Sequence, residues 1–536
     1  MKKHNAIKVV LVTMLIFLLL TWILPAAYYS GQFVDQGRVQ MGLFDLFNYP
    51  LTALSYFGYI GLFIILVGGF YGILYKIPAY RTFLEKIVGI FKGKESIAVS
   101  IIIAVISILV SVCGVHIGIA LFLPFVVAII LLMGYDKIVA ALATVGSICV
   151  GLIGTTYAVS SSSVLTSTFS VGYKYQIGVR FIILLVGIVL LIFNTIMYSK
   201  SAKKATVTAS KDKEEKKDEV KVEKVIEKKE TTKKEVPTKK STPAKKTTST
   251  KKTPTKKTTT KKSAKSSSSR KSANKAALVD EDVIVVPNKT TGKHKVAPIA
   301  IIFGLLFILF VLAFIPWGDT GLGVKLFDDI TKSAQEFKLF GFPIFAKVLG
   351  TFNSFGNWSI TDMFLPMGLS ILLLVIIYRV KLDDVFEGFM EGAKKALVPA
   401  LISILLYSIL VLVTYHPFQT TIYKAVLDLS KGFNIATTTI VAVLAGLFNS
   451  DIAYSFQSIA PYYTSVVTNA DNYQLAAVIF QSMYGLTMLV APTSLVLMGI
   501  LSYLNVSYKE WFKSVWKLLL ELFIVLLIVF IILGLM

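Results

Sequence analysis

Long runs of apolar residues, separated by short polar segments, dominate the pattern along this 536-residue chain. A bilayer core of about 30 Å is crossed by about 20 helical residues, and runs approaching or reaching that length recur in both halves. The clearest runs are residues 7–28, 59–75, 97–112, 177–197, 296–315, 365–378, 398–415 and 518–535. The pattern therefore predicts an all-α polytopic membrane protein.

The first of these runs, residues 7–28, lies where a secretory signal peptide would lie. It is long, it contains Trp22-Ile23-Leu24-Pro25, and Ala26-Ala27 offers only a weak small-residue cleavage site. Signal peptides have shorter apolar cores and a clearer site of that kind. We therefore expect this run to remain in the protein as its first membrane helix.

Two further apolar runs, one in each half of the chain, end in a similar way. Residues 151–158 read GLIGTTYA and residues 446–453 read GLFNSDIA, and each segment leads into a stretch rich in Ser and Tyr. Other features recur in the same order, such as the aromatic–basic pairs at residues 75–76 and 378–379. The shared order predicts an internal duplication with one broken helix in each half, which is typical of a transporter's substrate site.

A helix that breaks inside a bilayer exposes polar backbone groups, which survive only where they line a cavity. Freed carbonyls can bind a cation, and the start of the next half-helix favours an anionic group. The same reasoning applies to the run over residues 481–494, which Gly485 and Pro492 interrupt. The candidate substrate- or ion-binding residues are Gly154, Thr155, Thr156, Asn449, Ser450, Asp451, Ser455, Gln481, Thr487, Thr493 and Ser494.

A purely structural role is the alternative for these small and polar residues, since Gly and Ser also let membrane helices approach closely. For the serines at positions 160–163, packing or loop exposure is as good an explanation as substrate contact. For Asn449, Ser450 and Asp451 we favour a functional role. An acidic group at membrane depth is costly, so Asp451 is a candidate for binding a proton, Na⁺ or a substrate ammonium group. The alternative is that Asp451 lies solvated in a surface loop.

Two histidines, His116 and His416, follow apolar runs at corresponding places in the two halves. Histidine titrates near neutral pH, so both are candidates for a proton relay. His416-Pro417 looks like a helix end, however, and we favour a hydrogen-bonded or interfacial structural role for each histidine. No metal-ligand spacing joins them, and the chain's two cysteines lie in apolar runs. We therefore expect no metal site and no cofactor.

Hydrophobic residues make up 55% of the chain, and the formal net charge is +24. The basic residues are concentrated, because residues 200–295 hold 30 of the 55 Lys and Arg residues. This segment is a low-complexity mixture of Lys, Thr, Ser and Pro with almost no aromatic residues, so it cannot bury a core and we expect disorder. The chain then divides into a membrane half (residues 1–199), a linker (residues 200–295) and a second membrane half (residues 296–536).

Three roles are open for this linker. We favour a solvated tether between the two membrane halves. A polybasic strip that contacts anionic lipid on the cytoplasmic leaflet is the second interpretation. Nucleic-acid binding ranks last, because the linker has no aromatic side chains on which bases could stack.

Residues 481–498 (QSMYGLTMLVAPTSLVLM) and 508–513 (YKEWFK) resemble the C-terminal signature of the anaerobic C4-dicarboxylate carrier family. That family includes basic amino-acid antiporters and belongs to the ion transporter superfamily. Residues 20–26 (LTWILPA), Gly68-Gly69-Phe70 and Phe448-Asn449 also resemble it, so the resemblance covers both membrane halves. It implies a secondary carrier with two inverted halves, with hairpins that meet near the midplane.

The chain departs from the family pattern at the two breaks. Residues 160–163 replace the family's Asn-Pro after the first glycine break, and residues 450–455 replace its Ser-Gly stretch after Phe448-Asn449. These departures fall on the candidate site, so the family's substrate need not be the substrate of this chain.

The resemblance and the residues together predict an antiporter or ion-coupled symporter of a small charged metabolite. An amino acid such as arginine or ornithine ranks first, because Asp451 and the scarcity of membrane-embedded Lys and Arg suit a cationic or zwitterionic solute. A C4-dicarboxylate is the alternative, and coupling could use Na⁺, H⁺ or an exchanged solute. A membrane-anchored interaction protein acting through the linker is the alternative of another class. No GxSxG, HExxH or Walker-type motif in the membrane halves suggests an enzyme.

We expect the protein in the plasma membrane, where a homodimer is compatible with the sequence. Inverted halves require an odd number of crossings before the second half begins. The basic N-terminus and the Lys-rich linker both look cytoplasmic, which requires an even number, and long loops report poorly on topology. We favour a cytoplasmic linker, and an extra helix outside the repeat would reconcile the two arguments.

Overall fold

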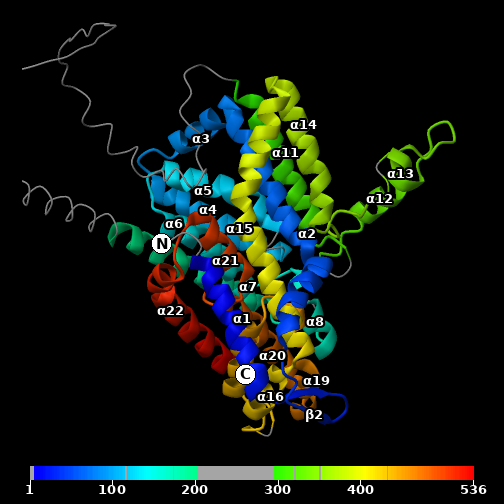
Figure 1. Ribbon diagram of the computed structural model, residues 1–536, viewed down its shortest axis with the longest axis vertical. Coiled ribbons are helices and arrows are strands. Elements are labelled where there is room, and N and C mark those ends of the chain that lie inside the picture. Colours follow the sequence, from blue (N-terminus) through cyan, green and yellow to red (C-terminus); the bar gives the residue numbers. More distant parts are fainter. Residues whose placement is uncertain are drawn as a thin grey trace, which may run out of the picture. The chain divides into compact units, whose positions relative to one another are not determined.

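The computed structural model describes residues 5–114, 118–172, 174–201, 295–318, 322–348, 350, 352–430 and 432–536. His116 and nearly all of the linker lie outside this range. Residues 1–199 and 281–536 form one compact unit, so the two membrane halves pack together as a single body. Figure 1 shows that this body is built almost entirely of helices.

The first half contains helices and one β-hairpin. Its elements are α1 (Asn5–Ile23), β1 (Ala26–Tyr29), β2 (Phe33–Gly37), α2 (Leu43–Lys76), α3 (Pro78–Ile90), α4 (Glu95–Cys113), η1 (Gly118–Leu121), α5 (Leu123–Leu132), α6 (Lys137–Ala141), the π-helical turn η2 (Leu142–Gly146), α7 (Ser147–Ile153), α8 (Val159–Phe169) and a helix over Ile177–Ser201.

The described elements of the second half are α-helices and short 3₁₀ turns. They are α11 (Ala297–Phe314), α12 (Leu326–Glu336), α13 (Ile344–Val348), η3 (Thr361–Met363), α14 (Phe364–Tyr378), α15 (Leu382–Tyr415), α16 (Phe418–Leu427), α17 (Ile435–Phe448), α18 (Ile452–Gln457), α19 (Ala460–Val466), η4 (Ala470–Asn472), α20 (Tyr473–Met488), α21 (Leu495–Leu504) and α22 (Tyr508–Leu535).

By length and composition, eight helices within the described residues could cross a membrane. Each of the eight runs singled out in the sequence contributes to one of them, so the prediction of an all-α polytopic membrane protein is confirmed. Shorter apolar helices, such as α17 and α21, add to the membrane body.

Two boundaries differ from the sequence prediction. The first apolar run is helical only to Ile23, because Pro25 disfavours helix in the residue before it, and the chain then forms the antiparallel hairpin β1–β2. The apolar run over residues 398–415 does not begin a helix of its own, because the amphipathic residues 382–396 before it belong to the same continuous helix despite Pro399. The amphipathic first part and the apolar second part of α15 therefore have different surroundings but belong to one helix.

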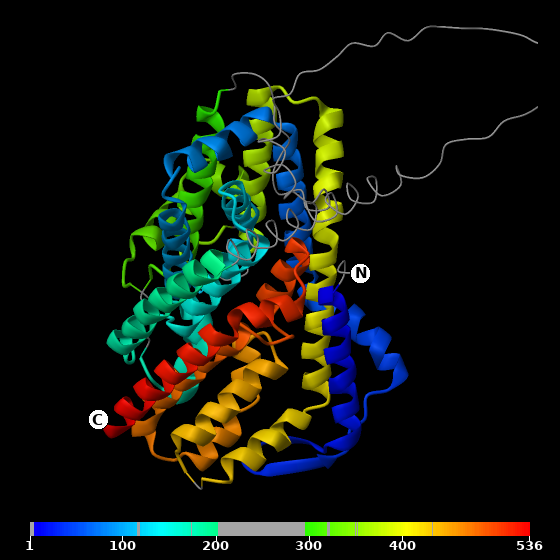
Figure 2. The same ribbon diagram turned by 90° about the vertical axis from the view of Figure 1, so that its left-hand side faces the viewer.

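The helices α2 and α15 form the longest packed pair of the molecule (Figures 1 and 2). Each has 34 residues, which corresponds to about 51 Å of helix and exceeds the bilayer core. They run antiparallel, with Tyr49 beside His416 at one end and Lys76 beside Glu387 at the other.

Glycines make the close approach of these two helices possible. A Cβ atom on Gly72 would lie 2.0 Å from the carbonyl oxygen of Gly388, and one on Gly392 would lie 2.0 Å from the carbonyl oxygen of Gly68. Pairs of small residues four apart are the usual means by which membrane helices pack backbone to backbone. The amphipathic part of α15 is therefore held by α2 along its small-residue face.

The duplication of the two halves stays a prediction. The aromatic–basic pairs align α2 with α14, but α14 has 15 residues where α2 has 34. The sequence counterparts of the separate helices α3 and α4 are joined in the single helix α15. The corresponding segments thus have different lengths and connections in the two halves.

Candidate functional site

The first break lies where the sequence predicted it, between the end of α7 at Ile153 and the start of α8 at Val159. Gly154 packs directly against the helix over Ile177–Ser201. A Cβ atom at Gly154 would lie 2.6 Å from the Cα atom of Leu184, so this contact requires glycine. Beyond the break, Ser162 donates to the carbonyl of Ala158 at 2.8 Å, which is a bond within its own helix.

Two side chains of α20 bind the carbonyls that the first break frees. The Gln481 carboxamide nitrogen donates to the carbonyl of Leu152 and to the hydroxyl of Thr155, both at 3.1 Å. Ser482 donates to the carbonyl of Ile153 at 3.0 Å. Because a buried carbonyl without a donor is costly, α20 stabilises the interrupted end of α7.

Two further donors come from other helices. Ser111 of α4 donates to the carbonyl of Gly154 at 2.6 Å, and its hydroxyl lies 3.0 Å from that of Thr156. The guanidinium of Arg180 donates to the carbonyl of Thr156 at 2.9 Å. Protein donors thus already occupy one acceptor position on each of these carbonyls, which we had expected to be open to a cation.

Arg180 is the residue that the sequence interpretation missed. Its side chain is 1% exposed, and its guanidinium carbon lies 4.1 Å from the centroid of the Tyr175 ring. It is the only charged residue between positions 177 and 197. A charged group inside a membrane-spanning run is a functional candidate by itself, so the signal was present in the sequence.

The second break, between Phe448 and Ile452, is held by local bonds. The side-chain oxygen of Asn449 accepts from the backbone nitrogen of Asp451 at 2.9 Å. One carboxylate oxygen of Asp451 accepts from the backbone nitrogens of Ala453 and Tyr454, at 2.9 and 3.1 Å. Asp451 is half-buried and is the N-cap of α18. An acidic N-cap stabilises the first turn of a helix, so its position has a structural explanation.

The remaining candidates of the second half lie around the same break. Ser455 donates to the backbone carbonyl of Asp451 at 2.7 Å. The hydroxyl of Thr493 donates to the carbonyl of Leu447 at 3.0 Å, and a Cβ atom at Gly446 would lie 3.0 Å from the Cβ atom of Thr487. Ser494 is the N-cap of α21. Ser455 and Thr493 therefore bind carbonyls at the break and Thr487 packs against Gly446 before it, whereas Ser494 caps its own helix.

The helix α20 brings the two breaks together (Figure 1). Gln481 binds the first break, whereas the hydroxyl of Tyr484 donates to the carbonyl of Ser450 in the second break. Three helical residues correspond to a rise of about 4.5 Å, so the two contacts lie within one turn. The segments after the breaks also meet, since the rings of Phe169 and Phe456 are 5.0 Å apart.

His416 lies at the end of α15 and is 5% exposed. Its Nε2 atom is 2.6 Å from the hydroxyl of Tyr49, and its Nδ1 atom is 2.7 Å from the carbonyl oxygen of Val39. These bonds connect the end of α15 to α2 and to the segment before α2. A proton relay through His416 stays a prediction, and the same role for His116 concerns a residue outside the described range.

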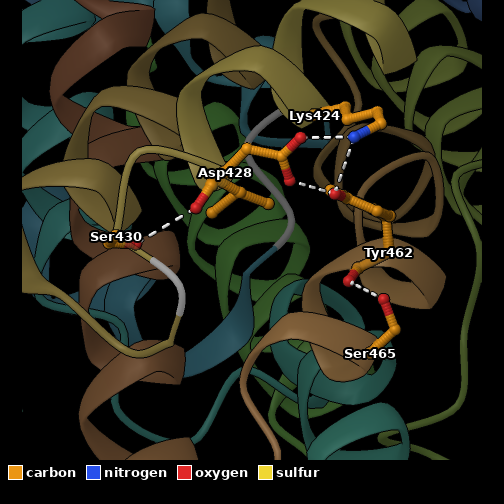
Figure 3. A network of polar contacts seen from close by, with 6 residues as sticks. Lys424, Asp428, Ser430, Tyr462 and Ser465 are labelled. Atoms are coloured by element: carbon orange, nitrogen blue, oxygen red, sulfur yellow. Dashed lines mark hydrogen bonds and ion pairs between the residues drawn. The ribbon is translucent and has the colours of Figure 1, made fainter.

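A polar network that the sequence did not indicate joins the end of α16 to α19 (Figure 3). Asp428 accepts hydrogen bonds from Lys424 and from the hydroxyl of Tyr462. The Tyr462 ring packs edge-on against Tyr29 at 5.7 Å and Phe33 at 5.9 Å. Burial raises the pKa of Asp428, but the two hydrogen bonds outweigh this effect and hold the pKa below its usual value.

The chain matches the family model described as C4-dicarboxylate anaerobic carrier over residues 4–238 and 245–535. The match includes most of the linker, which the resemblance noted in the sequence did not cover. No curated protein and no solved structure matches the chain. The match gives no support to the basic amino-acid antiporters that we ranked first.

A match of this extent, together with the apolar helices, makes the protein a multi-pass membrane carrier rather than an enzyme. The chain belongs to the C4-dicarboxylate anaerobic carrier family.

Proposed function

We propose that the protein is a secondary carrier that moves C4-dicarboxylates across the membrane. In this proposal the substrate binds where both helix breaks meet α20. The family supports the substrate class, and the contacts of Gln481 and Tyr484 support the place. A site at two interrupted helices in the middle of a bundle is the usual arrangement in secondary carriers.

The buried guanidinium of Arg180 carries this proposal. A dicarboxylate that leaves water needs a compensating positive charge, because an unpaired buried carboxylate is very costly. Arginine suits this task, since its planar group stays charged and can hold both oxygens of one carboxylate. Arg180 lies at the first break, where it donates to Thr156, and could bind one substrate carboxylate there.

A buried arginine also argues against the substrate that the sequence favoured. Arginine and ornithine carry a positive side chain, and a like charge beside Arg180 would raise the cost of binding them. Asp451, which suggested a cationic solute, already accepts two backbone hydrogen bonds as the cap of α18. Asp451 stays a candidate ligand for a coupling Na⁺ or H⁺.

The test is uptake of labelled succinate by proteoliposomes that contain the purified protein. Internal succinate, an inward Na⁺ gradient and an inward H⁺ gradient are applied separately, so exchange and ion coupling are distinguished. Arginine and ornithine are added as competitors. We expect saturable succinate uptake that malate and fumarate inhibit and arginine does not. The absence of dicarboxylate uptake under all three conditions would refute the proposed substrate class.

The place of the site is tested by Arg180→Gln, with Arg38→Gln as the control on an exposed arginine after β2. Removing one partner of a buried charged pair costs about 2–5 kcal/mol, so we expect kcat/KM for succinate to fall by about 30-fold or more. Arg180→Lys keeps the charge and should recover part of the activity. Normal uptake by Arg180→Gln would refute the assignment of Arg180 but not the substrate class.

A further inference from the structure

A short arm, residues 326–348, separates the membrane helices α11 and α14. It consists of α12, a turn and α13, and neither helix contains a buried residue. Figure 1 shows both helices projecting beyond the packed helices of the body. The arm therefore presents its side chains to surroundings other than its own chain.

The helix α12 has two chemically different faces. Leu326 and Ile330 lie on one face, where they are 57% and 52% exposed. Asp328, Lys332 and Glu336 lie on the opposite face, at the spacing that an α-helix requires. A helix that is apolar on one side and charged on the other favours a boundary between apolar and aqueous surroundings.

The turn after α12 continues the apolar face. Phe340 is 98% exposed and Phe342 is 53% exposed, although a bridge between Leu339 and Phe342 fixes the backbone of the turn. Beyond it, Val348 at the end of α13 is 71% exposed. Such a series of exposed large apolar groups marks a surface that contacts a partner or a membrane.

The base of the arm is fixed to the membrane body by aromatic contacts. The ring of Phe327 lies 5.1 Å from that of Trp317 and 5.7 Å from that of Phe355. Phe355 in turn lies 5.3 Å from Trp358. On the polar side, Gln335 donates to the carbonyl of Phe352 at 3.0 Å. These contacts hold α12 in place and leave its Leu326–Ile330 face uncovered.

The two tryptophans indicate the level at which the arm begins. Trp317 follows the end of α11, and Trp358 precedes η3 and α14. Both α11 and the continuous η3–α14 segment are long and apolar enough to span a bilayer. Tryptophan is enriched where such helices enter the membrane–water interface. The arm thus starts at the interface, where lipid lies beside the protein.

We propose that residues 326–348 lie in the membrane–water interface as a lipid-binding arm. The apolar side chains, with Phe340 at the tip, enter the boundary of the acyl chains, and Asp328, Lys332 and Glu336 face water. The partner is the bilayer itself, and the inference is independent of the transported substrate.

The test uses single cysteines labelled with an NBD fluorophore in nanodiscs. Ile330→Cys probes the apolar face, and Lys332→Cys, two residues away on the polar face, is the matched control. The native Cys113 and Cys149 are buried, and the unmutated protein reports any labelling of them. Nitroxide-labelled lipids quench probes in the bilayer, whereas iodide quenches probes in water.

We expect the label at position 330 to be quenched by the lipids and protected from iodide, and the label at position 332 to show the reverse. A label at Phe340→Cys should behave like the one at position 330. Equal quenching of both faces by iodide would refute the proposal. Protection of position 330 from both quenchers, together with energy transfer between labels on two copies, would instead place a second copy on this face and would also overturn it.

Discussion

The two helix breaks look alike in sequence, but the structure stabilises them in different ways. The first break depends on distant donors, because Ser111, Arg180 and Gln481 come from three other helices. The second break is capped mainly by its own residues, Asn449 and Asp451, with distant donors from Tyr484 and Thr493. Similar interruptions of a helix can thus be supported by tertiary packing in one case and by local capping in the other.

The difference also gives the two breaks opposite charges. Arg180 places a buried cation at the first break, whereas Asp451 places a half-buried carboxylate at the second. A substrate anion would therefore be attracted to the first break and a coupling cation to the second.

The largest difference between the breaks should appear in the free energy of unfolding when a glycine at each break is replaced by alanine. At Gly154 a Cβ atom would lie 2.6 Å from the backbone of Leu184, which cannot move without shifting its helix. At Gly446 the nearest atom is a Thr487 side-chain atom at 3.0 Å. We expect Gly154→Ala to lower the free energy of unfolding by about 3 kcal/mol and Gly446→Ala by about 1 kcal/mol. Denaturant unfolding in detergent measures both, and equal losses would contradict the comparison.

The second prediction separates the charge of Asp451 from its capping bonds. Asparagine caps helices as well as aspartate does, whereas alanine does not. We expect Asp451→Asn to keep both the stability and the succinate uptake, and Asp451→Ala to lose about 1 kcal/mol of stability. Thermal unfolding and uptake are measured on the same preparations. Loss of uptake in a stable Asp451→Asn protein would instead show that the charge is needed, as expected for a coupling-cation ligand.

The sequence predicted what depends on local pattern. The positions of the membrane helices and of both breaks follow from apolar runs and from Gly154 and Asn449. It did not predict the partners of Arg180, because a charge in an apolar run can face a cavity, an interface or another helix. Nor did it predict that residues 382–415 form one helix, since the close approach of Gly72 and Gly388 depends on a partner 316 positions away.

The third prediction concerns the Asp428 network at the end of α16. The pKa of Asp428 is lowered in the folded protein from the ordinary 3.8. Its stabilising contribution is therefore complete above that value and is lost as the pH falls through the lowered pKa. We expect the unfolding temperature to drop less steeply between pH 5 and about pH 3 in Asp428→Asn than in the wild type. The effect is small because the carboxylate is 44% exposed. An equal dependence of the unfolding temperature on pH in the two proteins would contradict this prediction.

The smallest effect is expected outside the membrane body. If the two breaks and α20 contain the transport machinery, residues 202–294 can be replaced by a Gly/Ser sequence of equal length with little change in succinate uptake. Flexible chains of this composition span the same distance without the Lys charges. Uptake in proteoliposomes with and without anionic lipid measures the effect. Loss of uptake only with anionic lipid would assign the basic segment a role at the membrane surface. Loss of uptake under both conditions would show that the two breaks and α20 do not contain the whole transport machinery.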